Sequence, residues 1–191
     1  KTVNKISYRI EKFADKKLII TGCMPVAEKE RIKKICPAAS LVSSQNISEI
    51  VDVVDKVMKN EQVILTGKNK KIKLSLPKHI EGKIISIQLG HGCRSFCAFC
   101  STKLAKGDLV SYPKEEIIKE IKVYLSKGYD KFNLTSTDNG CYGCDLGYDL
   151  ADLINDVCFI DKDFSFRDGM ANPQHLKFIV NKLIKSFKKP K

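Results

Sequence analysis

The chain has 191 residues, enough for one large domain or two small ones. Its net charge of +12, from 34 Lys and Arg against 22 Asp and Glu, favours a polyanionic partner, although the lysine-rich composition of an AT-rich genome explains it equally well. No run of about 18 apolar residues predicts a membrane span. Eight cysteines without a signal-like start predict a cytoplasmic protein whose thiols bind metal or take part in redox chemistry.

The first third of the chain alternates short apolar strands with amphipathic helices. In chain order, the pattern predicts a strand over 17–22, a helix over 26–36, a strand over 40–44 and a helix over 46–60. Asn46 or Ser48 is the expected N-cap of the second helix. Its expected apolar face consists of Ile47, Ile50, Val51, Val54 and Met58. This βαβ order predicts an α/β domain of the Rossmann or flavodoxin-like kind, with a parallel sheet.

The pattern is lost between residues 66 and 82, and we expect a domain boundary there that separates residues 1–76 from 77–191. The rhythm then resumes as three strand–helix pairs. The expected strands cover 84–89, 131–136 and 164–170, and the expected helices cover 111–128, 148–160 and 172–187. Three βα units predict part of a parallel barrel or open sheet, whose active-site residues lie at the C-terminal ends of the strands.

Three cysteines follow the first of these strands, at Cys93, Cys97 and Cys100. A structural zinc ion usually takes four protein ligands, so a partial zinc site is the less favoured interpretation. An iron–sulfur cluster on three thiolates would leave one iron open to an external ligand. Phe99 could shield such a cluster from water, and His91 could donate a hydrogen bond to its sulfur.

The spacing C-x3-C-x2-C, with an aromatic residue before the last cysteine, resembles that of the radical S-adenosylmethionine enzymes. Four further stretches resemble the tRNA methylthiotransferases, in their archaeal and eukaryotic branch: "CSTKLAKGDLVSYPKEEI", "NLTSTDNGCYGCDLG", "FRDGMANP" and "IITGCMP". That branch places a methylthio group on C2 of N6-threonylcarbamoyladenosine beside the tRNA anticodon. The resemblance implies a partial methylthiotransferase domain followed by the first half of a partial TIM barrel of the radical S-adenosylmethionine kind.

The resemblance also implies the cofactors and partners. Cys93, Cys97 and Cys100 would hold a [4Fe–4S] cluster whose open iron binds S-adenosylmethionine, and an electron from this cluster would generate a deoxyadenosyl radical. Cys23 would be the third ligand of an auxiliary cluster whose other two cysteines precede Lys1. The chain would then be an interior fragment, inactive alone. Its implied partners are tRNA and an electron donor such as a flavodoxin or ferredoxin.

Five residues at two strand ends are implied to bind the cofactor. Thr135, Ser136 and Asp138 would accept hydrogen bonds from its ammonium group. Arg167 and Asn172 would reach its carboxylate, its ribose or the substrate. Asp138 and Asn139 are also of types that favour a plain turn.

Three residues depart from the family's pattern. Thr137 stands where an acidic or amide residue is expected, and Asp168 stands where an apolar one is. Cys144 replaces a basic or apolar residue.

The remaining cysteines are expected to have no catalytic part. Cys141 and Cys144 form a lone C-x2-C pair, which could bind metal or carry redox equivalents, but we expect two free thiols. Cys36 and Cys158 fit as small buried hydrophobes.

His79 and His175 have no expected partner that suggests catalysis. Two other functions stay open at this point. One is a zinc-dependent nucleic-acid-binding module, and the other is a radical S-adenosylmethionine enzyme that acts on another macromolecule.

Overall fold

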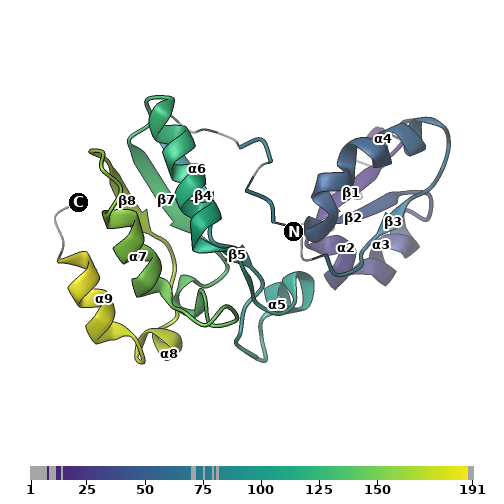
Figure 1. Ribbon diagram of the computed structural model, residues 1–191. Coiled ribbons are helices and arrows are strands. Elements are labelled where there is room, and N and C mark those ends of the chain that lie inside the picture. Colours follow the sequence, from purple (N-terminus) through teal and green to yellow (C-terminus); the bar gives the residue numbers. More distant parts are fainter. Residues whose placement is uncertain are drawn as a thin grey trace. The chain divides into compact units, whose positions relative to one another are not determined.

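The computed structural model describes residues 8, 12–13, 15–69, 72–74, 76–78, 80 and 82–188. Contacts divide the chain into two units (Figure 1). The first unit holds the described residues of Lys1–Lys71 together with Cys97–Lys106, and the second holds those of Ile72–Phe96 and Gly107–Lys191. The boundary expected between residues 76 and 77 stays a prediction. His79 and the first seven residues lie outside the described residues.

The first unit is built on a parallel sheet in the order β1-β2-β3, as the βαβ pattern predicts. Its strands are β1 (Ile19–Gly22), β2 (Ser40–Ser43) and β3 (Ile64–Leu65). Its helices are α2 (Met24–Ala27), α3 (Lys29–Ile35), α4 (Ile50–Met58) and α5 (Ser101–Lys106), with a 3-10 helix, η1 (Ser44–Glu49).

Helices cover both faces of this sheet, because neighbouring strand residues point to opposite sides. Ile20 and Leu41 pack with Ile32 of α3 in one apolar cluster. Val42 packs with Val53 of α4 in a second cluster. The unit is therefore a three-layer α/β/α arrangement, and the predicted Rossmann-like class is confirmed at this level (Figure 1).

The predicted apolar face of the helix over 46–60 is wrong. Val51 and Met58 are 68% and 67% exposed, whereas Val53 is 1% exposed and faces the sheet. The first turns form η1, so the α-helix begins only at Ile50. Asn46 is not an N-cap: its side-chain amide donates to Ser43 Oγ, Leu65 O and Gly67 O and so joins the loops after two strands.

The second unit holds a parallel sheet in the order β4-β7-β8. These strands are β4 (Ile84–Gln88), β7 (Lys131–Thr135) and β8 (Ser165–Asp168). The helices that follow them are α6 (Lys114–Ser126), α7 (Leu150–Cys158), α8 (Pro173–Leu176) and α9 (Val180–Phe187). Two helices therefore occupy the stretch where one was expected over 172–187. Asn172 caps the first of them, as its side chain accepts from Gln174 N at 3.0 Å.

One face of this sheet is apolar and the other is polar. Ile85, Ile87, Phe132 and Leu134 are buried in a single core with residues of α6 and α7. The opposite face carries a cross-strand row in which Ser86 pairs with Asn133 and Asn133 with Arg167. Parallel sheets usually have apolar residues on both faces. The second face is therefore suited to line a polar space.

No helix among the described residues is long and apolar enough to cross a membrane.

We predict that Asn46→Ala lowers the free energy of unfolding by about 1–3 kcal/mol, because it removes a buried amide that serves several acceptors. Ser48→Ala is the matched control, since Ser48 is exposed and should change stability by less than about 0.5 kcal/mol. Urea unfolding followed by circular dichroism measures both. A larger effect of Ser48→Ala would restore Ser48 as the helix cap.

Candidate functional site at the strand ends

The loop that carries Cys93, Cys97 and Cys100 begins and ends at a short antiparallel pair of strands. Directly after β4, β5 (Gly90–His91) pairs with β6 (Val110–Ser111). Gly92 lies so close to the returning chain that a Cβ there would be 1.9 Å from Asp108 O, and its φ of +72° also favours glycine. Cys93 is therefore held at the base of the loop, next to the C-terminal edge of the sheet.

Asp138 is the centre of a buried hydrogen-bond network at this edge. Its Oδ1 accepts from the backbone N–H groups of Gly140 at 3.0 Å and Asn172 at 2.9 Å. Its Oδ2 lies 2.7 Å from His175 Nδ1. A carboxylate can only accept, so this pairing assigns the histidine proton to Nδ1. The network links the loop after β7 with the loop and helix after β8.

The histidine extends this network to the cysteine loop. Ser95 Oγ lies 3.3 Å from His175 Nε2, which is the free acceptor when Nδ1 carries the proton. Ser95, His175 and Asp138 thus form a continuous chain of polar groups across all three strand ends. His175 therefore has two polar partners, Asp138 and Ser95, which the sequence did not indicate. Asn172 and Pro173 mark a helix start, and that signal would have placed His175 in the first turn at a strand end.

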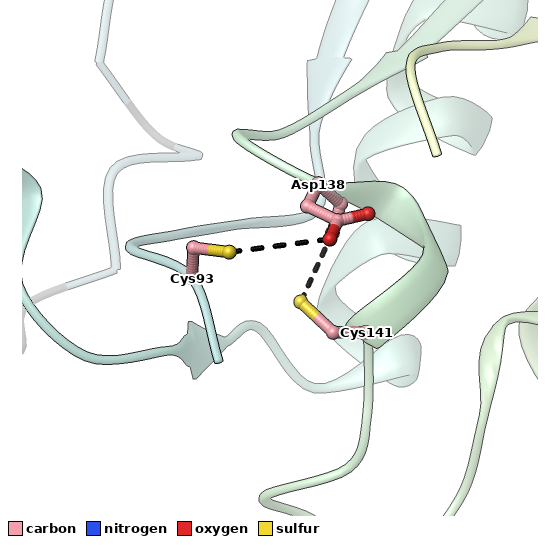
Figure 2. A group of neighbouring side chains, drawn as sticks. All are labelled: Cys93, Asp138 and Cys141. Atoms are coloured by element: carbon pink, nitrogen blue, oxygen red, sulfur yellow. Dashed lines mark hydrogen bonds between the residues drawn. The ribbon is translucent and has the colours of Figure 1, made fainter. Parts of the chain in front are cut away.

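Two thiols lie beside the Asp138 carboxylate. The Sγ atoms of Cys93 and Cys141 and an oxygen of Asp138 are all within 4.8 Å of one another, and Figure 2 shows the three side chains facing each other. Cys93 Sγ is 3.9 Å from Asp138 Oδ2, and Cys141 Sγ donates to Asp138 O at 3.2 Å. Cys141 is fully buried, whereas Cys144 is exposed, so the expected pair of cysteines is divided between two environments.

Burial raises the pKa of the Cys141 thiol to about 12, and a hydrogen bond from the Arg94 backbone offsets part of this effect. The backbone N–H of Ser95 donates to Cys93 Sγ at 3.3 Å. Both sulfur atoms therefore have a backbone donor from the same loop. Such donors favour the thiolate, which is the form that binds metals, but at Cys141 the effect of burial is larger and favours the thiol.

Asn139 joins the ends of β7 and β8 beneath this group. Its amide donates to Leu134 O at 3.0 Å and to Asp168 Oδ1 at 2.7 Å, and its Oδ1 accepts from Ser136 Oγ at 2.6 Å. Asn139 is completely buried. The sequence predicts only a plain turn at Asn139. In the structure its side chain also fixes the ends of two strands relative to each other.

The residues predicted to bind a cofactor fall into two groups. Thr135 and Arg167 are exposed, at strand positions that share the polar face. Ser136, Asp138 and Asn172 belong to the hydrogen-bonded loops at the strand ends. All five lie in the second unit, and their assignment to cofactor groups stays a prediction.

The predicted metal ligands are divided between the units. Cys93 belongs to the second unit, whereas Cys23, Cys97 and Cys100 belong to the first. Cys23 is exposed directly after β1, and Cys100 N donates to Cys97 O at 3.0 Å. Phe99, the expected shield of the cluster, is 91% exposed.

Other singled-out residues have structural surroundings. His91 is buried, with its ring against Tyr112 at a centroid distance of 6.1 Å. Cys36 and Cys158 are partly buried and pack against the apolar cores, as expected for small hydrophobes. The hydroxyl of Thr137 is buried and has no hydrogen-bond partner within the part of the chain that the structure describes.

No model of a protein family matches the chain, but curated proteins do. A probable threonylcarbamoyladenosine tRNA methylthiotransferase of Pyrococcus horikoshii is 35% identical over 196 residues, covering 100% of this chain and 46% of that protein. The threonylcarbamoyladenosine tRNA methylthiotransferase of Danio rerio is 35% identical over 173 residues, covering 85% of this chain and 31% of that protein. By its sequence, the chain is similar to members of this family, and the Pyrococcus protein aligns with it along its entire length. It spans about half or less of the length of these relatives.

Burial raises the pKa of Asp168 above its ordinary value of 3.8, and hydrogen bonds from Asn139 and Gly169 offset only part of the shift. The folded chain therefore holds this proton more tightly than the unfolded chain. Stability is then lost as pH rises from the ordinary pKa through the raised one.

We predict that Asp168→Asn, which keeps an acceptor for Asn139, gains stability relative to the unsubstituted chain as pH rises above about 4. Urea unfolding at a series of pH values measures this difference. Asp163→Asn, at an exposed aspartate of the preceding turn, is the control and should show a smaller pH-dependent difference. A constant difference between Asp168→Asn and the unsubstituted chain would contradict the prediction.

Proposed function

We propose that the chain is the part of a tRNA methylthiotransferase that holds a [4Fe–4S] cluster and S-adenosylmethionine, and that the whole enzyme modifies C2 of N6-threonylcarbamoyladenosine. The observation that carries this proposal is the match along the entire chain to proteins with that name. The archaeal relatives align over 100% of this chain. A zinc-dependent binding module or an enzyme for another macromolecule has no comparable support.

The second unit fits the first half of a partial barrel. Its three parallel strands are covered by helices on one face, while the other face carries Ser86, Asn133 and Arg167. In a barrel this face points inward, where polar groups can bind a charged ligand. Its strand ends carry the loops with Cys93 and Asp138, which is where enzymes of this architecture place their chemistry.

The donor set fits the proposed cofactors. Cys93 is partly exposed, and the Ser95 N–H that donates to its sulfur favours the thiolate that a cluster requires. Cys97 and Cys100 are partly exposed as well. When bound, the cluster supplies one electron to S-adenosylmethionine.

The loops after β7 and β8 would orient the cofactor. Thr135, Ser136 and Asp138 offer oxygen atoms to its ammonium group. Arg167 offers a cation to its carboxylate, and Asn172 is placed by the same network. The buried hydroxyl of Thr137 adds an oxygen at the same turn. In the first unit, Cys23 would hold the auxiliary cluster.

The partner classes follow from charge and chemistry. A net charge of +12 suits tRNA, because cationic side chains release counterions from its phosphates and so gain affinity. An external electron donor, such as a flavodoxin or ferredoxin, would reduce the cluster in a cytoplasmic setting.

We predict that anaerobic iron–sulfur reconstitution yields a reduced cluster with an EPR signal that shifts when S-adenosylmethionine is added. Cys97→Ala should abolish the signal, because it removes one of three ligands. Cys144→Ala, at an exposed cysteine outside the motif, should retain it. Formation of 5′-deoxyadenosine on reduction gives a second measurement.

A chain that has been stripped of zinc with a chelator and still forms no cluster on reconstitution would remove the radical mechanism. A signal that survives Cys97→Ala would place the cluster on other cysteines. Mass spectrometry of nucleosides from tRNA incubated with an assembled enzyme that contains this chain tests the methylthio transfer itself.

A further inference from the structure

Cys93, Asp138 and Cys141 form a set of metal-ligating groups that the three-cysteine motif does not explain. Their ligand atoms lie within 4.8 Å of one another, entirely within the second unit (Figure 2). Cys141 is outside the C-x3-C-x2-C motif, and its side chain nevertheless meets that of Cys93. We propose that these three residues bind a zinc ion when Cys93 is not a ligand of a cluster.

The distances suit one tetrahedral ion. With Zn–S near ~2.3 Å and Zn–O near ~2.0–2.2 Å, ligand atoms on the same zinc lie about 3.5–3.8 Å apart. Cys93 Sγ and Asp138 Oδ2 are already 3.9 Å apart. Two thiols with one carboxylate favour zinc over magnesium or calcium, which take oxygen ligands.

The carboxylate is fixed before any ion arrives. Asp138 Oδ1 is occupied by two backbone N–H groups, of Gly140 and Asn172, and so Oδ2 is the oxygen turned towards Cys93. His175 Nδ1 donates to Oδ2, and Ser95 holds the other ring nitrogen. Hydrogen bonds of this kind orient metal-binding groups and strengthen the site.

The sulfur atoms are also placed for a metal. Backbone donors from Arg94 and Ser95 reach Cys141 and Cys93, respectively. Binding would replace two thiol protons, which pass to solvent, and would transfer no electrons. Three protein ligands leave the fourth zinc position to a water molecule.

A consequence follows that rests on the proposed function. Cys93 would be a ligand both of the zinc ion and of the [4Fe–4S] cluster, and Asp138 would serve both the zinc ion and the cofactor's ammonium group. The two states therefore exclude each other. Zinc would hold the second unit in a form that cannot accept the cluster.

The test uses Co²⁺ as a spectroscopic substitute for zinc, on the full chain with Cys97→Ser and Cys100→Ser combined so that the cluster motif is disabled. We expect one Co²⁺ per chain, with a thiolate-to-cobalt charge-transfer band in the near ultraviolet. Adding Cys141→Ser or Asp138→Asn should abolish the band, while the matched variant Cys144→Ser should keep it. No band in the doubly substituted chain, or a band that survives Cys141→Ser, would overturn the proposal.

A substituted ligand could abolish the cobalt band simply because the variant misfolds. Alkylation of Cys93 tests the same site without substituting any of its ligands. In the doubly substituted chain, zinc should slow the reaction of Cys93 with iodoacetamide and leave Cys144 unaffected, as read by mass spectrometry. An unchanged Cys93 rate would overturn the site without any substitution of its ligands.

In the unsubstituted chain, zinc added before reconstitution should lower cluster content, and Cys141→Ser should remove that inhibition. Equal inhibition in both would overturn the exclusion. A cluster that fails to form even without zinc would count against the proposed function alone, because the cobalt experiment does not depend on it.

Discussion

The buried amide of Asn139 is the constraint on which the strand-end site depends. It donates to a backbone carbonyl at the end of β7 and to the Asp168 carboxylate at the end of β8. A fully buried amide left without partners would cost about 1–3 kcal/mol per group, so its bonds are satisfied only when both strand ends are in register. Asp138, the preceding residue, can then reach across to the helix after β8. Hydrogen bonds then join the loops after β4, β7 and β8 at one edge of the sheet.

Helices cover only one face of the β4-β7-β8 sheet, so the strand-end site lies between an apolar face and a polar face. The apolar face is filled by α6 and α7, which fixes the strands, so the opposite face is free to carry polar side chains. Asn133 lies between Ser86 and Arg167 in register across that face. The apolar contacts that stabilise the sheet thus lie on its helix side, and its other face carries the polar row. The loops of Cys93 and Asp138 stand at the end of both faces.

Much of the fold was predictable because apolar periodicity reports burial directly. The strands, the parallel order and most helices follow from it. The buried face of α4 was not predictable, because apolar residues lie on several sides of that helix. Val51 and Val53 are equally hydrophobic, and only the position of the sheet decides that Val53 is buried. Asn46 was misread for a related reason. Its position before a helix suggests a cap, but its acceptors at Leu65 and Gly67 are distant in sequence.

The same limit explains what the sequence could tell about the site. Spacing predicts that Cys93 is one of three ligands, because that pattern lies within one loop. The pairing of Cys93 with Cys141 depends instead on how the loop after β4 meets the loop after β7, which no spacing records. The local C-x2-C spacing instead suggests that Cys141 pairs with Cys144, but the structure buries Cys141 and exposes Cys144. The two proposed sites share Cys93 and differ in the loop that supplies the other ligands. Cys97 and Cys100 would complete the cluster site, whereas Asp138 and Cys141 would complete the zinc site.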